Sequence, residues 1–349
     1  MLSSSNNIST SCIVGRAILR EGVDCSTAVN MKAGRRAVVS LSSWFCVPEQ
    51  GMKDFEILNR ASAFLVRSRT WKHQQEAGTR GPRVHVLTAS HVVAPWRWPK
   101  YYPEDWLQQV NERHTAYTLE LRHDDGVFAT QNELRPVSYH HAKRDLAVLH
   151  LEDEEDALEV MNELGVDVLT LTPPGDDVVL REGDALEFHG HNISAHDFSA
   201  SEDTRKPLPS SSKGFVQGRT QHQIFAQTDP VLSQGMCGGP VLVKRNGQTF
   251  CAGLIEGIVP ADHAIKAIQS LAVFVESPEL QGFLDDVEQG RIEPLVGGES
   301  IAVVNCDKDE SKMDLQKIIS NDDDESSKLS PRTSNFSSSP SSSLSKRRP

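Results

Sequence analysis

The sequence predicts an all-β fold, a barrel or a sandwich, closed by a helix near its end. Many short runs rich in β-branched and apolar residues recur between turn signals, which is typical of such folds. Helical spacing of apolar residues is confined to 157–164 and 278–288, with a further short helix expected at 105–112. The chain of 349 residues is long enough for two compact units and flanking tails.

The strands are expected at short intervals along the whole central part of the chain. In the first half they cover 37–41, 61–66, 84–88, 115–121, 126–130, 145–151 and 168–171. In the second half they cover 184–191, 214–217, 223–228, 240–243, 251–258 and 270–275. The polar stretch 195–213, with its prolines and serine run, is expected to be a loop.

An aromatic segment interrupts the strands after residue 94. Its aromatic residues are Trp96, Trp98, Tyr101, Tyr102 and Trp106. Three prolines, at 95, 99 and 103, exclude a long helix before Pro103. The segment either fastens a surface loop to the barrel or lines a groove for a peptide or partner protein, because aromatic side chains supply rigid contact area.

The two ends differ in composition from the centre. Residues 1–36 are polar, and 1–20 combine serines and two arginines with no acidic residue, which indicates either a mitochondrial or plastid transit peptide or a flexible tail. Residues 291–349 become acidic and then Ser/Pro-rich, so we expect them to be disordered, since they bury too little apolar surface to offset their ordering entropy.

Composition also limits the compartment and the partners. No run of eighteen apolar residues and no apolar secretory signal is present, so we expect no membrane span and an intracellular protein, cytoplasmic if the first segment is not a transit peptide. Six scattered cysteines without a CxxC pair indicate reduced thiols. The net charge of −12 argues against nucleic acid or an anionic membrane as the main partner.

The candidate site centres on Cys237, in the loop Gln234-Gly235-Met236-Cys237-Gly238-Gly239-Pro240. Glycines lack a Cβ, so this loop bends tightly and its backbone N–H groups point to a common place. A thiol there is a candidate nucleophile, and the N–H groups of Gly235 and Cys237 are candidate donors to an oxyanion. Two upstream stretches add His91, after the strand at 84–88, and Asp145, before the strand Leu146–Leu149.

Thr88-Ala89-Ser90-His91, Asp145-Leu146-Ala147-Val148-Leu149 and Gly235-Met236-Cys237-Gly238-Gly239-Pro240 resemble the three signatures of trypsin-like (chymotrypsin-fold) peptidases. The resemblance is closest to the HtrA/Deg-type branch, where Gly-Asp precedes a Gly turn, as Gly183-Asp184 does here, and Gln-Thr-Asp precedes the nucleophile loop, as at 227–229. It implies two six-stranded antiparallel Greek-key barrels over 37–290, split into 37–172 and 173–290 with the closing helix.

The resemblance also implies an endopeptidase that acts through an acyl-enzyme, with a protein or peptide as substrate and no cofactor. Cys237 would attack the carbonyl, His91 would move the proton, and Asp145 would orient the imidazole. The alternative is a weak or inactive relative that serves as a protein-binding scaffold. The wall of the primary specificity pocket would include Leu254, Ile255, Glu256 and Gly257, and an inward-facing Glu256 would favour basic side chains.

The chain departs from the cellular family in three respects. Cys237 stands where the cellular family usually has serine, and in this respect the loop resembles that of the viral chymotrypsin-like cysteine proteases. A thiol ionises more readily than a hydroxyl, but a barrel shaped for a serine oxygen positions the larger sulfur less well. Met236 stands where trypsin-type digestive enzymes carry an Asp, so activation would not use that ion pair. The residues after 290 are too few and too polar for a PDZ-like domain.

Several other polar groups have ordinary interpretations. His189-Gly190-His191 has no further ligand at a suitable spacing, so no metal site is expected. His140-His141 is expected to lie outside the triad, and Cys251 and Cys46 to be small apolar core residues. Asp124, Asp125 and Asp229 are rival acids, but none precedes an apolar strand as Asp145 does.

Overall fold

The computed structural model describes residues 36–70, 81–122, 128–172, 179–192, 207–245 and 247–295. The expected N-terminal segment, apart from Arg36, and the disordered tail expected from 291 onward, apart from residues 291–295, lie outside these residues; Leu295 forms a bridge with Ser138. Asp124 and Asp125 lie outside them too. No helix among the described residues combines the length and the apolar character needed to cross a membrane.

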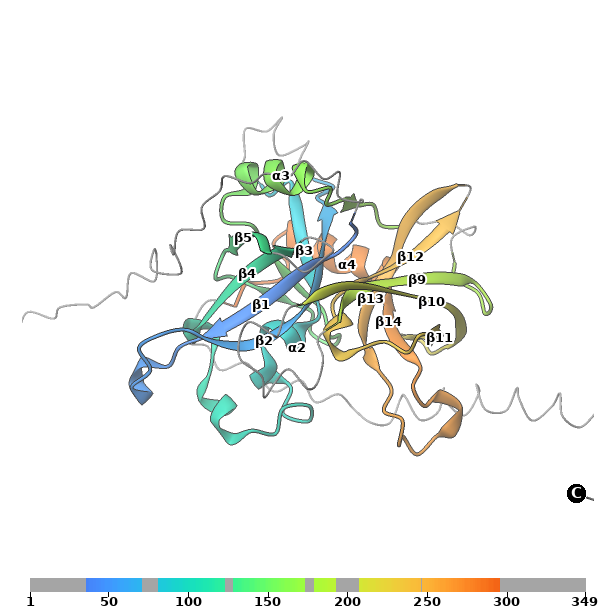
Figure 1. Ribbon diagram of the computed structural model, residues 1–349, viewed down its shortest axis with the longest axis horizontal. Coiled ribbons are helices and arrows are strands. Elements are labelled where there is room, and N and C mark those ends of the chain that lie inside the picture. The colour runs from blue at the N-terminus through green and yellow to red at the C-terminus, as the bar shows by residue number, and fades with distance from the viewer. Residues whose placement is uncertain are drawn as a thin grey trace, which may run out of the picture. The chain divides into compact units, whose positions relative to one another are not determined.

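The described chain is mainly β, as predicted, in one sheet and one closed barrel that lie side by side (Figure 1). The elements of the first half are β1 (Val39–Phe45), β2 (Glu56–Arg67), β3 (Val84–Thr88), α2 (Ser90–Val93), β4 (Thr115–Arg122), β5 (Phe128–Leu134), β6 (Tyr139–His140), β7 (Ala147–Leu149), α3 (Glu154–Glu163) and β8 (Val168–Leu169). Those of the second half are β9 (Ala185–Asn192), β10 (Leu208–Arg219), β11 (Ile224–Asp229), η8 (Gln234–Met236), β12 (Pro240–Arg245), β13 (Gln248–Ile258), β14 (Ala272–Glu276) and α4 (Ser277–Glu288).

The first half differs in detail from the six-stranded barrel that the resemblance implied. Its strand order is β5-β4-β1-β2-β3-β7-β6, and the short strand β8 pairs in parallel with β2. The chain after β7 meets the end of β5 through a bridge between Leu134 and Leu151. Two hydrogen bonds flank this bridge, from the Arg135 N–H to the His150 carbonyl (2.9 Å) and from the Glu152 N–H to the Glu133 carbonyl (3.2 Å). The edge strand β5 therefore contacts the chain that follows β7, next to the other edge of the sheet.

The second half is a closed barrel with the strand order β10-β11-β14-β13-β12-β9. β10 begins at Leu208, inside the stretch expected to be a loop, because Ser210–Ser212 pair through their backbone with β9. Polar side chains are compatible with a strand here, since several residues of the β10 start are partly exposed. The barrel interior is filled by apolar side chains that include Phe188, Val241 and Phe274.

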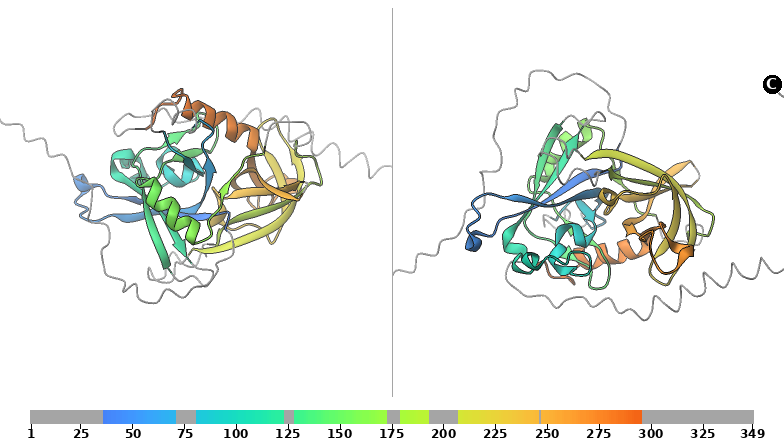
Figure 2. Two further views of the ribbon diagram at one scale, coloured as in Figure 1. Left: turned by 90° about the horizontal axis from the view of Figure 1, so that it is seen from above. Right: turned by 60° about the horizontal axis from the view of Figure 1, so that its bottom comes forward.

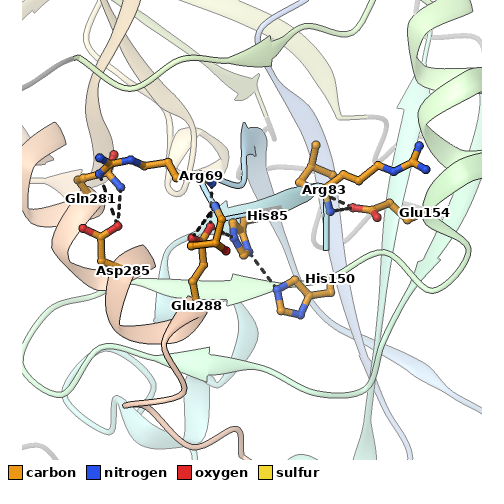
Figure 3. A network of polar contacts seen from close by, with 10 residues as sticks. Arg69, Arg83, His85, His150, Glu154, Gln281, Asp285 and Glu288 are labelled. Atoms are coloured by element: carbon orange, nitrogen blue, oxygen red, sulfur yellow. Dashed lines mark hydrogen bonds and ion pairs between the residues drawn. The ribbon is translucent and has the colours of Figure 1, made fainter. Parts of the chain in front are cut away.

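The closing helix α4 joins the two halves. It begins at the end of β14 in the barrel and runs back to the first sheet (Figure 2). Its apolar side chains Leu280, Phe283 and Leu284 are buried in the core of the first half, at the spacing that predicted the helix. At its end, the Glu288 carboxylate accepts hydrogen bonds from the Arg69 and Thr70 N–H groups (3.1 and 3.2 Å) and bonds His85 Nε2 at 2.8 Å (Figure 3).

The expected short helix at 105–112 is divided into two 3-10 turns, at Asp105–Gln109 and Glu112–His114. A third 3-10 turn begins at Pro95 and leads into the aromatic segment. Leu107 and Val110 pack with Phe45 and Val47 in a small satellite cluster that also includes Trp96 and Tyr102. These contacts attach the aromatic segment to the first sheet, and they leave Tyr101 68% exposed.

Candidate active site

His91 lies on α2, a single helical turn at the end of β3. Its neighbours Ala89, Val92 and Val93 are fully buried in the first core, so the turn has little freedom to move. The turn is also braced by His140, which bonds the Ser90 hydroxyl (2.7 Å) and the Ser138 hydroxyl (2.8 Å). Burial lowers the pKa of His140 well below its usual value, so this ring is neutral and structural.

Asp145 lies in the turn before β7 and holds His91 through both of its carboxylate oxygens. Oδ1 accepts from the His91 backbone N–H (2.8 Å), and Oδ2 lies 2.5 Å from His91 Nδ1. The second contact requires a proton between Nδ1 and the carboxylate, so Nε2 is free to face the nucleophile loop. The rival acid Asp229 is exposed and lies in β11 opposite Lys213.

Cys237 follows the short helix η8 and is partly buried. Its carbonyl accepts from the Ser62 N–H on β2 (3.0 Å). The Gly238 N–H donates to the Ile255 carbonyl (2.8 Å), and the Ile255 N–H donates to the Gly239 carbonyl (2.9 Å). The loop is therefore bonded to a strand of each half, at Cys237 and at the two glycines that follow it.

Two glycines of this loop are required by space. Gly238 has φ +80°, and a Cβ there would lie 2.3 Å from the Ser62 carbonyl oxygen and 2.3 Å from Thr88 Oγ1. A Cβ at Gly239 would lie 2.1 Å from the His189 carbonyl oxygen. Any other residue would displace the backbone of β2 or β9. The glycines that singled out the loop in the sequence thus let it approach both halves closely.

The charges around His91 favour the protonated form of its imidazole. Burial lowers the pKa of His91, but the charge and hydrogen bond of Asp145, followed by interaction with Cys237, outweigh it and raise this pKa well above its usual value. Tyr102 stacks on the His91 ring with centroids 6.2 Å apart, and Asn59 donates to its hydroxyl (3.1 Å). The exposed Tyr101 ring lies 6.4 Å from the same imidazole.

Ser62 is a site residue that the sequence analysis missed. Its hydroxyl donates to the Gly235 carbonyl (2.7 Å) and accepts from the His191 N–H (2.8 Å). The buried His191 ring, whose pKa is lowered to about 3 mainly by burial, lies against the same hydroxyl. The sequence marks Ser62 only as a serine within the apolar run of β2. Its two hydrogen-bond partners, Gly235 and His191, lie more than a hundred residues away in the sequence.

The remaining predicted residues are placed as follows. Leu254 and Ile255 are fully buried, and Glu256 and Gly257 are partly buried beside them on β13. Met236 is buried in the barrel core above Gly190. Cys251 is fully buried, and burial raises the pKa of its thiol to about 12, as expected of an apolar core residue. Among the described residues, no group of three or more His, Cys, Asp or Glu side chains is placed to hold a metal ion.

Comparisons with known proteins give a distant structural similarity. The sequence matches no family model and no curated protein. Among solved structures, the chain is similar to an HtrA-type protease, AlgW, with a decapeptide, at 16% sequence identity and a TM-score of 0.40. The match covers 72% of this chain and 64% of that chain. This chain thus spans less than two thirds of that structure, and a functional assignment depends on its own site geometry.

Proposed function

We propose that the chain is an endopeptidase that hydrolyses peptide bonds through Cys237, His91 and Asp145. The observation that carries this proposal is the bidentate hold of Asp145 on His91, together with the interaction between the imidazole and the Cys237 thiol. A raised pKa of the imidazole favours transfer of the thiol proton to it, and the thiolate is the nucleophile. A buried structural histidine has the opposite shift, as His140 does.

The proposed reaction balances within these groups. The Cys237 thiolate adds to the peptide carbonyl carbon, and the oxyanion is held by the N–H groups of Gly235 and Cys237. The C–N bond breaks, and the His91 imidazolium gives its proton to the leaving amine, which leaves a thioester. His91 then takes a proton from water as the hydroxide adds to the thioester, and release of the carboxylic acid restores the thiol. Asp145 keeps the imidazole oriented throughout.

The substrate would be a peptide or protein segment bound along the nucleophile loop. The segment Leu254–Gly257 contains Ile255, which exchanges two backbone hydrogen bonds with this loop, and this supports the proposed role of the segment as the wall of the primary pocket. The aromatic rings beside His91 support the groove interpretation of the aromatic segment, because the exposed Tyr101 ring next to the imidazole offers contact area to a bound chain.

Alkylation kinetics test the proposal most directly. The full-length protein is treated with a thiol-selective alkylator across a pH series, and labelled cysteines are identified by mass spectrometry. We expect Cys237 to be labelled faster than the other cysteines, and we expect this difference to be lost in His91→Ala. Cys251 is the internal control, because it is buried and its thiol is held protonated.

A peptide library then distinguishes an enzyme from a scaffold. Cleavage that is lost in Cys237→Ala supports the peptidase. If Cys237 reacts no faster than the other thiols and no peptide is cut, the endopeptidase proposal is wrong, and binding of uncut peptides would favour the protein-binding scaffold. Cys237→Ser further tests whether this loop positions an oxygen nucleophile productively.

A further inference from the structure

Ser43 on β1 and Asn59 on β2 lie opposite each other in the first sheet, and the proposed chemistry uses neither of them. We propose that this cross-strand pair positions the His91 imidazole from two sides, Ser43 through the α2 turn and Asn59 through the Tyr102 ring. The proposal rests on the proposed function, since it concerns the orientation of the same base. Both side chains act through another residue, so they are positioning residues.

The imidazole of His91 needs a second constraint beyond Asp145. The Asp145 carboxylate bonds the His91 backbone N–H and Nδ1 (2.8 and 2.5 Å), but a bond at one ring nitrogen leaves the plane of the ring free to turn about it. The χ2 torsion of a histidine is broad and does not restrain that turn. The Tyr102 ring supplies the restraint, since it stacks on the imidazole with centroids 6.2 Å apart and 30° between the planes. The direction of Nε2 therefore depends on where Tyr102 is held.

Asn59 holds Tyr102 by its hydroxyl group. Asn59 Nδ2 donates to the Tyr102 hydroxyl (3.1 Å), and Asn59 Oδ1 accepts from the Arg60 backbone N–H (2.9 Å). The second bond fixes which end of the amide faces Tyr102, because only the NH2 end can donate. The backbone N–H of Tyr102 donates to the Trp98 carbonyl (3.0 Å). Tyr102 is therefore attached at its backbone and at the tip of its ring, with the His91 imidazole stacked between these two points.

An irregularity in the sheet brings Asn59 to this position. The pairing of β1 with β2 shifts directly after Ser43, and the register skips Leu58. Leu58 is therefore the extra residue of a bulge. It packs against the same satellite cluster as Tyr102, while Asn59 bonds the hydroxyl of that tyrosine. In a regular strand these two consecutive side chains would point to opposite faces of the sheet, so the bulge allows both of them to face the aromatic segment.

Ser43 braces His91 from its backbone, through the α2 turn. Its buried hydroxyl donates to the Val92 carbonyl at 2.8 Å and lies 3.3 Å from the Asn59 carbonyl oxygen. A helix of one turn cannot satisfy its own last carbonyl groups, so the Val92 carbonyl needs a partner from outside the turn. Ser43 and Asn59 thus join the backbone and the ring of His91 to one place in the first sheet.

The pair matters because His91 acts through the direction of one nitrogen atom. In the proposed reaction, Nε2 must face the Cys237 thiol to accept its proton and then the leaving amine to return it. When the Asn59 bond is lost, Tyr102 loses its fixed position, and the imidazole samples orientations in which Nε2 faces elsewhere. A misplacement of about 1 Å can cost about a hundredfold in rate, so we expect a partial loss of orientation to cost about tenfold.

Alkylation of Cys237 and NMR of the full-length protein test the role of Asn59. Asn59→Leu has nearly the same size but no donor, so we expect labelling of Cys237 to slow about tenfold. The nuclear Overhauser contact between the rings of His91 and Tyr102 should weaken at the same time. Tyr102→Phe removes only the acceptor and should slow labelling equally. The double variant should be no slower than either single variant, because all three lack the same hydrogen bond.

Ser43→Ala should slow labelling by a similar factor, because it leaves the Val92 carbonyl without this partner. Ser40→Ala is its matched control, since Ser40 is a buried serine of the same strand whose hydroxyl has no hydrogen-bond partner among the described residues. Asn132→Leu is the matched control for Asn59. Asn132 is a partly buried asparagine on β5, and its amide nitrogen has no hydrogen-bond partner within the described part of the chain. We expect both controls to leave the labelling rate and the ring contact unchanged.

Urea denaturation establishes that each variant is folded under the assay conditions, and Tyr102→Phe, which removes a single oxygen atom, replaces Asn59→Leu if the latter does not fold. If folded Asn59→Leu is labelled as fast as wild type, or if Asn132→Leu slows labelling equally, the role of Asn59 is refuted. Ser43→Ala and Ser40→Ala decide the role of Ser43 in the same way. Fast labelling of wild-type Cys237 would in that case still support the peptidase. If wild-type Cys237 is not labelled selectively, the peptidase proposal fails, while a weakened ring contact in Asn59→Leu would still support the positioning of His91.

Discussion

Acidification is expected to destabilise the fold through histidines that are buried as neutral rings. Burial is the main cause that lowers the pKa of His150 and of His191 to about 3, and it lowers the pKa of His140 well below its usual value. In the unfolded chain each of these rings takes up a proton near the ordinary value of about 6.5. Below that pH the unfolded state binds more protons, so stability falls as pH falls.

The contribution of these three histidines and of Glu256 to the slope of stability against pH follows from a count of their protons, and the lowered pKa values of His141 and His189 add in the same direction as the three histidines. Below about pH 6 the unfolded state holds three histidine protons that the folded state lacks. Glu256, whose pKa is raised to about 7, opposes one of them, because it keeps a proton that the unfolded carboxyl group has released above about pH 4.3. The difference of two protons gives a loss of about 2.7 kcal/mol in the free energy of unfolding per pH unit near pH 5.5.

His91 acts on the other side of neutrality. Its raised pKa means that it is protonated in both states below about pH 6.5 and adds no slope there. As pH rises through the folded-state pKa, the folded chain loses a proton that had stabilised it, so stability falls again. The free energy of unfolding is therefore expected to pass through a maximum near neutral pH.

Urea denaturation at a series of pH values measures this slope. His150→Gln removes one titrating ring and should flatten the acid limb by about 1.4 kcal/mol per pH unit. Glu256→Gln removes the opposing group and should steepen it by the same amount. The two variants thus have effects of opposite sign. An acid limb that is unchanged in both variants would refute the assignment of these groups as neutral in the fold.

Three further predictions concern contacts in the two halves. Gly238→Ala should lower the free energy of unfolding, measured by urea denaturation, by about 3 to 5 kcal/mol. The substitution adds a Cβ to a residue with φ +80°, and this Cβ would lie 2.3 Å from two oxygen atoms. A loss below about 1 kcal/mol would contradict this. Ser62→Ala should slow alkylation of Cys237 and lower the free energy of unfolding by about 1 to 3 kcal/mol, because the Gly235 carbonyl and the His191 N–H lose a buried partner. An unchanged alkylation rate would argue against a role of Ser62 in the site. Glu288→Gln should lower the free energy of unfolding by about 2 kcal/mol. Because the folded-state pKa of Glu288 is lowered to about 2, this difference from wild type should stay constant between about pH 7 and pH 5 and vanish only in stronger acid. A difference that already shrinks at about pH 5 would contradict this.

The sequence predicted the elements best where the physical signal was local. The strand at 84–88 and the closing helix α4 lie where the alternation and the helical spacing of apolar residues predicted them. The start of β10 was missed, because Ser210–Ser212 pair through the backbone while their side chains carry no apolar pattern. β8 is two residues long and pairs in parallel with β2, a contact that no local pattern indicates.

The residues of the candidate site could be predicted where they lie next to a recognisable apolar strand or glycine-rich loop. His91 and Asp145 each follow or precede an apolar strand, and the hydrogen bonds between them join segments 54 residues apart. Ser62 lacked such a mark, because its part in the site depends on how the barrel loop meets β2. Glu256 was expected in the pocket wall, and its hydrogen bond with the Gln223 side chain, 33 residues away, has no local signal in the sequence.

The arrangement separates the placement of the nucleophile from its activation. Placement depends on backbone contacts: Gly238 and Gly239 fit against carbonyl groups of β2 and β9, and Ile255 bonds the loop from β13. None of these contacts involves the side chain of residue 237, so the loop can hold cysteine or serine in the same backbone position. The proposed activation depends instead on the charge of His91, which Asp145 stabilises. A thiol needs less of this charge than a hydroxyl does, because it ionises more readily. Loss of the Asp145 carboxylate is therefore expected to be better tolerated with cysteine at position 237 than with serine, and Cys237→Ser should make cleavage more sensitive to Asp145→Asn.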